Sequence, residues 1–286
     1  MRSFRYVLAD VFTETPLQGN QLGVFTDARD LDDAAMQSLA LELGFSESVF
    51  VLPPREGGHA RIRIFTPTHE LPFAGHPTLG TAFVLGAPLQ LGTILLETGR
   101  GIVPVELERD ASGRITFGLM TQPVPTVASF ERVDELCEAL GVRGSALPVE
   151  VYDNGVQHVY VALESESDVA GVTPDWTGLA ASELVAALVG VNVFAGSDCR
   201  WKTRMFSPLD GVGEDAATGS AAGPLACHLA RHGWVPWGER LEISQGVEIG
   251  RPSTLYATAF GTGETIERVE VGGSAVAVAR GEFRIP

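Results

Sequence analysis

A six-residue motif occurs twice in this chain and indicates that its two halves fold alike. Ile62–Pro67 (IRIFTP) corresponds position by position to Thr203–Pro208 (TRMFSP), with the arginine, the phenylalanine and the proline identical. After each copy an irregular segment leads to a glycine that opens a helix, Gly75 in the first copy and Gly219 in the second. A chance match of one hexapeptide is the alternative. The matching order of the upstream elements favours duplication of a unit of about 140 residues.

The pattern of apolar residues predicts an α+β fold with two similar domains that face each other. The domains cover residues 1–122 and 126–266, and Pro123-Val124-Pro125 is the linker. The expected strands are 4–9, 19–25, 45–52, 60–65, 155–163 and 191–194, and the expected helices are 32–43, 77–85, 130–140, 180–188 and 220–232. Residues 269–279 are predicted to form a β-hairpin that turns at Gly272-Gly273.

The composition excludes several classes of protein. The 286 residues carry a formal net charge of −16, whereas binding to nucleic acid or to an anionic membrane surface needs clustered lysine and arginine. Apolar residues make up 45% of the chain, which is enough for a core, and no run approaches the ~20 apolar residues of a membrane span. The N-terminus does not fit a signal peptide. Three widely spaced cysteines suit reduced thiols, so we expect a cytoplasmic protein.

Two predicted helix N-termini are candidates for binding an anion. Gly75-His76-Pro77 and Gly219-Ser220-Ala221 each place a glycine directly before a helix. The first N–H groups of a helix lack an intrahelical acceptor, and the helix dipole adds partial positive charge. If the domains face each other, both ends converge on one cleft that would hold a carboxylate. Ordinary capping is the better explanation of either end alone, and the two explanations are equally good for the pair.

Three side chains are candidates for acid/base chemistry. Glu47 interrupts a β-patterned apolar segment, and apolar neighbours raise the pKa of a carboxylic acid toward neutrality. The matching strand of the second copy, Val191–Phe194, has no acid, so the fold does not require one. Asp215 can orient a histidine or a substrate amine, and His76 can be its acid/base partner. Each also has a plainer explanation: an outward-facing strand residue, a solvated loop acid and a helix cap.

The sequence indicates neither a metal site nor a cofactor. His69 and Glu70 with His76 resemble metal ligands only loosely. His228 and His232 are four residues apart, but at the C-terminal end of a helix, where imidazoles more often interact with carbonyl groups and the helix dipole. There is no P-loop, nucleophile elbow or dinucleotide fingerprint. Cofactor-free acid/base chemistry is therefore the economical interpretation.

Four groups of residues together resemble the PhzF-type phenazine-biosynthesis isomerases. They are Phe45–Phe50 (FSESVF), Phe65–Pro67 with Leu71–Pro77 (FTP, LPFAGHP), Glu214–Ala221 (EDAATGSA), and Gln245-Gly246 with Gly250–Ser253 (GRPS). The match extends in order over nearly the whole chain. It implies the fold of diaminopimelate epimerase, with two related domains, each a strongly curved, mostly antiparallel sheet around a central helix, and the site between them. It also implies a homodimer and a C-terminal strand, within 267–286, that returns to the first domain.

The resemblance further implies a role for each candidate residue. In that family the residue that matches Glu47 moves a proton between two carbons of an unsaturated cyclic amino acid, trans-2,3-dihydro-3-hydroxyanthranilate. The residues that hold or polarise this substrate match His76, Asp215 and Ser220. The two glycines whose backbone approaches it match Gly75 and Gly219.

The leading hypothesis is a cofactor-independent isomerase that acts on a small, cyclic, amino-bearing carboxylate. A small-molecule-binding protein without turnover is the alternative from another class, and the presence of Glu47, His76 and Asp215 argues against it. An amino-acid epimerase or racemase is a third hypothesis. The related enzymes of that kind place a cysteine before the glycine of each helix end, whereas this chain has Ala74 and Thr218 there.

Overall fold

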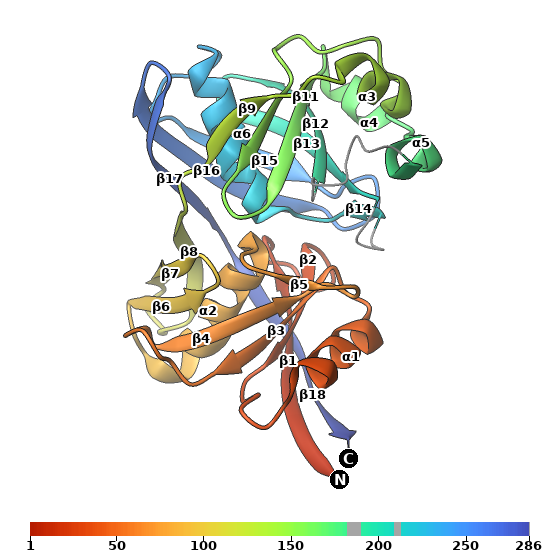
Figure 1. The fold of residues 1–286 in the computed structure, drawn as a ribbon. Helices are drawn as coiled ribbons and strands as arrows, with labels where there is room; N and C mark the ends of the chain where they lie inside the picture. The colour runs from red at the N-terminus through yellow and green to blue at the C-terminus, as the bar shows by residue number, and fades with distance from the viewer. Residues whose placement is uncertain (182–189, 209–212, 286) are drawn as a thin grey trace.

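The computed structural model describes residues 1–181, 190–208 and 213–285, and it shows two halves of similar construction stacked on each other (Figure 1). The first half contains β1 (Arg2–Val11), β2 (Asn20–Phe25), α1 (Asp33–Leu43), β3 (Glu47–Leu52), β4 (Ala60–Phe65), β5 (Glu70–Leu71), α2 (Gly75–Leu89), β6 (Thr93–Thr98), β7 (Gly101–Arg109) and β8 (Ile115–Gln122). The second half contains β9 (Thr126–Ser129), α3 (Val133–Leu140), β10 (Glu150–Asp153), β11 (Gln157–Ala162), α4 (Glu166–Gly171), α5 (Trp176–Ala181), β12 (Gly190–Ser197), β13 (Arg200–Ser207), β14 (Gly213–Asp215), α6 (Gly219–Arg231), β15 (Arg240–Gln245), β16 (Ser253–Thr262) and β17 (Thr265–Gly273). The last strand, β18 (Ala275–Ile285), lies in the first half beside β1.

Both halves order their strands in the same way. The first half pairs β1-β2-β3-β4-β6-β7-β8, and the second pairs β10-β11-β12-β13-β15-β16-β17. Parallel pairs occur at equivalent places, β2–β3 and β4–β6 in one half and β11–β12 and β13–β15 in the other. The remaining ladders are antiparallel. The expected α+β class, with two similar, mostly antiparallel halves, is therefore confirmed.

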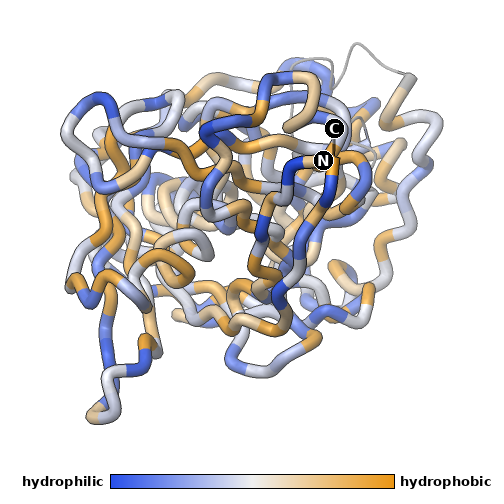
Figure 2. Tube along the Cα trace, turned by 90° about the horizontal axis from the view of Figure 1, so that it is seen from below, coloured by the Kyte–Doolittle hydropathy of each residue, from blue (hydrophilic) through white to orange (hydrophobic). Residues whose placement is uncertain are grey.

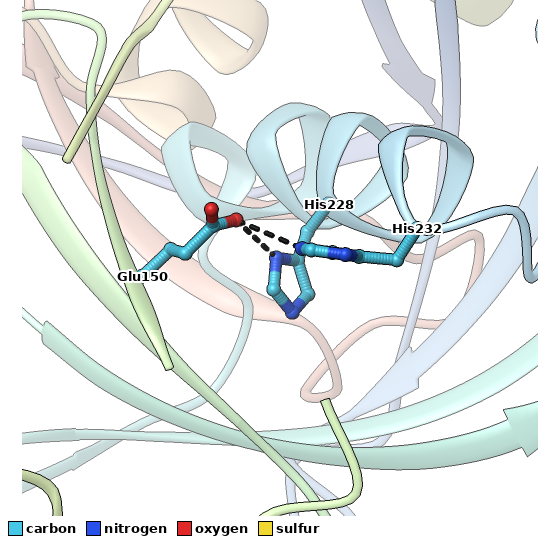
Figure 3. Close-up of side chains that lie close together, drawn as sticks. All are labelled: Glu150, His228 and His232. Carbon is cyan, nitrogen blue, oxygen red and sulfur yellow. Dashed lines mark hydrogen bonds and ion pairs between the residues drawn. The ribbon is translucent and has the colours of Figure 1, made fainter. Parts of the chain in front are cut away.

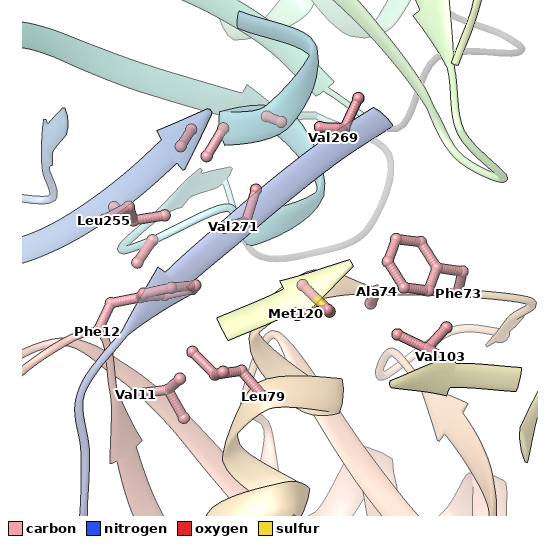
Figure 4. Close-up of a cluster of buried hydrophobic side chains, with 14 of the residues drawn as sticks. Val11, Phe12, Phe73, Ala74, Leu79, Val103, Met120, Leu255, Val269 and Val271 are labelled. Atoms are coloured by element: carbon pink, nitrogen blue, oxygen red, sulfur yellow. The ribbon is translucent and has the colours of Figure 1, made fainter. Parts of the chain in front are cut away.

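Each half encloses one central helix. The helices α2 and α6 are buried over most of their length, and strands of their own half contact them from several sides. One apolar cluster continues through both halves: Leu79 of α2 and Met120 of β8 pack in the same core as Val269 and Val271 of β17 (Figure 4). This shared core packs the two halves against each other.

The chain crosses between the halves twice. After β8, the chain forms β9, which pairs with β10, and after β17 it forms β18, which pairs with β1 from Arg2–Ile285 to Val11–Ala275. The two crossing strands β8 and β17 also pair with each other. The chain termini consequently lie side by side (Figure 2).

The predicted hairpin at residues 269–279 is wrong. β17 and β18 are nearly continuous and pair with different partners, and the hairpin of this region is β16–β17 instead. The glycine pair serves close packing, because a methyl group on Gly273 would lie 2.4 Å from the ring of Phe12, and one on Gly272 would lie 2.6 Å from Phe117. A Gly-Gly pair therefore looks the same in sequence whether it turns the chain or admits an aromatic ring.

The other boundaries differ by a few residues. α1 begins after Asp32, whose side chain accepts a hydrogen bond from the N–H of Ala35, and ends at Gly44 in the left-handed conformation. The central helices begin at Gly75 and Gly219 themselves. The helix predicted for residues 180–188 lies almost entirely outside the described residues.

Candidate active site

The N-termini of α2 and α6 touch at the boundary between the halves. A methyl group added to Gly75 would lie 2.3 Å from the carbonyl carbon of Gly219, and one added to Gly219 would lie 3.0 Å from the carbonyl carbon of Gly75. At position 75 only glycine permits this approach of one backbone to the other. The first N–H groups of each helix lack an acceptor in their own helix, so both dipoles direct partial positive charge to one place. The structure thus brings together the two helix ends that the sequence predicts to converge.

A small pocket beside the helix ends is lined by both halves. The lining residues are Ser46, Glu47, Thr66, Leu71, Ala74, Val156, Met205, Ser207, Asp215, Thr218 and Ser220. Its cavity volume of about 20 Å³ is room for about one water molecule. The groove of about 760 Å³ beside α2 and β18 is far larger. It contains none of the six candidate residues, so the small pocket is the better candidate on chemical grounds.

Glu47 begins β3 and faces this pocket from the first half. Its side chain is 15% exposed, and its Oε2 lies 3.6 Å from Nδ1 of His76. In the β2–β3 ladder it stands opposite the fully buried Leu22. The geometry therefore differs from the outward-facing strand residue that was the plainer explanation of the sequence.

His76 is the second residue of α2 and is almost completely buried. Burial lowers its pKa to about 4, against the opposing effects of the negative charge of Asp215 and a backbone hydrogen bond with Gln21. The imidazole is therefore neutral near pH 7. It can donate or accept a hydrogen bond beside Glu47, but it does not supply a positive charge.

Asn20, at the start of β2, connects the candidate residues, and the sequence analysis missed it. Its Nδ2 donates to Oδ1 of Asp215 at 2.8 Å and to the carbonyl of Ala217 at 2.9 Å, and lies 3.3 Å from Nδ1 of His76. Its Oδ1 accepts a hydrogen bond from Ser46. One amide thus joins the start of the first half to the loop before α6.

The second half holds the chain that leads into Asn20. Arg251, within the GRPS motif, donates from Nε to the carbonyl of Gly19 at 2.9 Å and pairs with the buried Asp10 at 2.7 Å. Gly19 has a φ of +68°, and a methyl group there would lie 2.4 Å from the carbonyl oxygen of Val11. The position of Asn20 therefore depends on a contact between residues that are distant in sequence.

Asp215 ends β14 and is buried under hydrogen bonds from the second half. Its Oδ2 accepts from the hydroxyl of Thr218 at 2.7 Å, and its backbone carbonyl accepts from Nε2 of Gln245 at 3.0 Å. Gln245 also donates to the Thr218 hydroxyl and accepts from the Thr218 N–H. This network fixes the carboxylate, which is therefore not the solvated loop acid of the plainer explanation.

Ser220 is the second residue of α6, at the position equivalent to His76. Its Oγ lies 3.0 Å from Nε2 of the fully buried His158, and its backbone carbonyl accepts a hydrogen bond from Asn154 at 2.9 Å. The sequence analysis placed His158 in a strand without a role. The only sequence signal for it is a histidine directly before the apolar run Val159–Leu163.

Glu150, His228 and His232 form the one group among the described residues whose atoms are spaced as metal ligands would be (Figure 3). Both imidazoles point at Oε2 of Glu150, at 3.2 and 3.0 Å. The same oxygen also accepts from Nη1 of Arg231 at 2.8 Å, and these hydrogen bonds hold the pKa of Glu150 well below its usual range despite its burial. Because a guanidinium already neutralises this carboxylate, the donor set does not fit a cation. The cluster joins β10 to the C-terminal end of α6, away from the two helix N-termini.

Comparison with known proteins agrees with the geometry. Residues 9–281 match the PhzC-PhzF family, described as phenazine biosynthesis-like protein. The chain is 53% identical to a trans-2,3-dihydro-3-hydroxyanthranilate isomerase from Pseudomonas aeruginosa, over 97% of this chain and 98% of the relative. It is 51% identical to an isomerase of the same name from Pseudomonas fluorescens, over 96% and 98%. The crystal structure of a PhzF-family protein from Bacillus anthracis superposes with a TM-score of 0.85 at 26% identity and covers all of both chains.

No helix in the described part of the chain is long and apolar enough to cross a membrane. The family match spans both halves and includes Glu47, both helix N-termini and the loop that carries Asp215. The chain therefore belongs to the PhzC-PhzF family of phenazine biosynthesis-like proteins and is an isomerase.

Proposed function

We propose that this isomerase moves a proton between two carbons of a small, cyclic, amino-bearing carboxylate, without a cofactor. Trans-2,3-dihydro-3-hydroxyanthranilate, the compound in the names of the relatives, is the first candidate substrate. The observation that carries the proposal is the position of Glu47. It is a partly buried carboxylate of the first half, 3.6 Å from His76, in a pocket that Asp215 and Ser220 of the second half also line.

Glu47 is the general acid/base in this proposal. Its carboxylate takes a proton from one ring carbon, the electron pair of that C–H bond shifts into the conjugated double bonds, and the same carboxylic acid returns the proton to another carbon. Substrate and product are isomers, so no oxidant or reductant is needed. A single flexible acid can serve both positions if the substrate is fixed and water is excluded.

The remaining residues bind and orient the substrate. The paired helix ends hold the carboxylate through the backbone N–H groups next to Gly75 and Gly219. The hydroxyl of Ser220 donates a further hydrogen bond to it. Asp215 is available to the substrate amine as a negative charge, and the neutral His76 orients Glu47. The pocket has room for about one water molecule, which is too little for the substrate. We therefore propose that the chain has two domains, which move apart to admit the substrate. The first consists of residues 1–122 with 267–286, and the second of residues 126–266.

The test compares Glu47→Gln with a matched substitution elsewhere. Glutamine keeps the shape of the side chain but removes the base, so turnover of trans-2,3-dihydro-3-hydroxyanthranilate should fall by roughly 10² or more. Glu42→Gln, at an exposed site on α1, should leave turnover unchanged. Equal activity of the two variants would overturn the role of Glu47. Binding of the compound by the wild-type protein without turnover would favour a binding protein instead.

An epimerase mechanism with two thiols has less support. The three cysteines are free and lie outside the pocket, at Cys137, Cys199 and Cys227. Burial raises the pKa of the Cys227 thiol to about 12, so this residue does not form a thiolate near neutral pH. Replacement of all three by serine or alanine should therefore leave turnover within about twofold of the wild type, whereas loss of activity would reopen this mechanism.

We further propose that the protein works in the cytoplasm as a homodimer. Free cysteines suit a reducing compartment, and the family resemblance implies the dimer. Light scattering coupled to size-exclusion chromatography should give twice the 30.4 kDa mass of one chain. A monomer mass at micromolar concentration would contradict the dimer.

A further inference from the structure

His158 in the second half occupies the position that Leu22 occupies in the first half. Ser48 stands opposite Phe65 in the first half, and Val191 stands opposite Phe206 in the second. These two phenylalanines are the matching residues of the repeated motif. Glu47 therefore corresponds to Gly190, and the residues opposite them in the parallel ladders are Leu22 and His158.

In each half, one of the two residues that stand opposite each other in the parallel ladder has an ionisable side chain. That side chain lies next to the second residue of the central helix. In the first half the side chain is Glu47, on β3, next to His76. In the second half it is His158, on β11, next to Ser220. Gly190 leaves room for that ring, because a methyl group there would lie 2.9 Å from Nδ1 of His158. The same methyl group would lie 2.6 Å from Sδ of Met205, so the glycine gives room to both side chains.

The surroundings of the ring determine which nitrogen carries its proton. His158 is fully buried, and its Nδ1 has no hydrogen-bond partner within the described residues, whereas Nε2 lies 3.0 Å from Oγ of Ser220. A buried N–H group without an acceptor is rarer than a buried lone pair without a donor. The proton therefore belongs on Nε2. Burial also lowers the pKa of His158 to about 3, so the ring stays neutral.

This tautomer has a consequence for Ser220. If Nε2–H donates to Oγ, the serine hydroxyl is an acceptor toward His158 and its own hydrogen is free to point elsewhere. Ser220 lines the pocket, and Asn154 holds its backbone carbonyl. The hydroxyl hydrogen therefore points into the pocket, where a substrate carboxylate would accept it.

We infer that His158 is a positioning residue that orients the Ser220 hydroxyl as a hydrogen-bond donor toward the substrate carboxylate. This inference rests on the proposed function for the identity of the acceptor, but not for the tautomer. His158 does not itself line the pocket. Its effect on a ligand should therefore pass entirely through Ser220.

The first experiment needs no substrate. Nuclear magnetic resonance of protein labelled with ¹⁵N-histidine, with the His158 signals assigned from their loss in His158→Gln, reports the tautomer directly. We expect a neutral ring protonated on Nε2 throughout pH 5.5–8. A ring protonated on Nδ1, or one that titrates in this range, would overturn the inference even if the proposed function is correct.

The second experiment measures binding of 3-hydroxyanthranilate, a stable aromatic compound with carboxylate, amino and hydroxyl substituents, by calorimetry. His158→Gln keeps an N–H donor at the reach of Nε2 and should bind within about threefold of the wild type. His158→Met has a similar size but no donor and should bind about tenfold more weakly. In a Ser220→Ala background the methionine substitution should add nothing.

Two results would show that His158 only packs the core. One is equal weakening by His158→Gln and His158→Met, and the other is a loss from His158→Met that persists in Ser220→Ala. Circular dichroism and thermal unfolding check that each variant is folded. Should Glu47→Gln retain full turnover, the proposed function fails, yet the tautomer and the coupling between His158 and Ser220 are still measured independently of it.

Discussion

The two halves of the molecule repeat one backbone and differ in the side chains that stand at equivalent places on it. In the first half the residue after the helix glycine is His76, next to Glu47, with Asn20 against both helix ends. In the second half it is Ser220, next to His158. Duplication thus supplies two helix ends that can hold an anion, and the divergence of the side chains places an acid at the position of Glu47 in the first half only, because the second half has Gly190 there. Under the proposed function, the first half transfers the proton, the helix ends of both halves hold the carboxylate, and the second half adds the Ser220 hydroxyl.

The largest effect should come from breaking the contact between the two helix ends. A methyl group on Gly75 meets the backbone of Gly219 at 2.3 Å, whereas one on Gly219 has its nearest neighbours at 3.0 Å. We expect Gly75→Ala to lower the free energy of unfolding by about 3 kcal/mol and Gly219→Ala by about 1 kcal/mol. Urea unfolding measures both. Gly92→Ala, where a methyl group meets nothing within 4 Å, is the control, and equal losses at Gly75 and Gly219 would contradict the asymmetry.

A smaller effect should follow from removing the amides that tie each half to a helix end. Asn20→Leu takes the donor away from the buried Asp215 carboxylate and from the Ala217 carbonyl, and should cost about 2 kcal/mol of stability. Asn154→Leu removes one hydrogen bond, to the carbonyl of Ser220, and should cost about 1 kcal/mol. Chemical denaturation of both variants checks the order, and a larger loss for Asn154→Leu would reverse our view of which amide matters more.

The dependence of stability on pH should reveal one buried neutral histidine in each half. The pKa of His76 is lowered to about 4 and that of His158 to about 3 by burial, whereas an unfolded histidine titrates near 6.5. As the pH falls through 6.5, the unfolded chain binds protons that the folded chain does not, so stability is lost toward acid. Each histidine should contribute about 1.4 kcal/mol per pH unit between about pH 4.5 and 6.

His76→Gln and His158→Gln should each remove one such contribution, and the double variant should remove two. The measurement is the slope of the unfolding free energy against pH, with an exposed histidine substitution, His59→Gln, as the control. An unchanged slope in either variant would mean that its histidine is protonated in the folded protein, which for His158 would also conflict with the inferred tautomer.

The sequence predicts the parts of this site that are local and misses those that depend on contacts between distant residues. Gly75 and Gly219 are visible because a glycine before a helix start has a known local effect, and the repeated motif shows that the two ends are equivalent. Asn20 is not visible, since its partners His76 and Asp215 lie 56 and 195 residues away. His158 likewise contacts Ser220 across 62 residues. Nothing in the few residues around Asn20 or His158 indicates that it touches a helix end.

The fold shows the same division. The repeated unit and its central helices follow from the duplicated pattern, and so the α+β class was predictable. The Gly272-Gly273 pair was misjudged because a glycine needed for packing against Phe12 cannot be told from a turn glycine without knowing what lies across from it. The roles of Glu47, His76 and Asp215 in turnover stay predictions, because geometry brings them together but does not measure a rate.

The smallest effect is expected at the C-terminal ends of the central helices, where the halves also differ. α2 ends at Leu89, whereas the last turn of α6 carries His228 and Arg231, which lie with the following His232 around Glu150. A metal ion at this cluster would have to displace the guanidinium that lies 2.8 Å from the carboxylate. A chelator should therefore leave turnover and the melting temperature unchanged, and added zinc should shift the melting temperature by less than about 1 °C. A rise of several degrees in the melting temperature with zinc, absent in His232→Ala, would show that the metal displaces Arg231 from Glu150. The second half would then carry a metal site that the first half lacks.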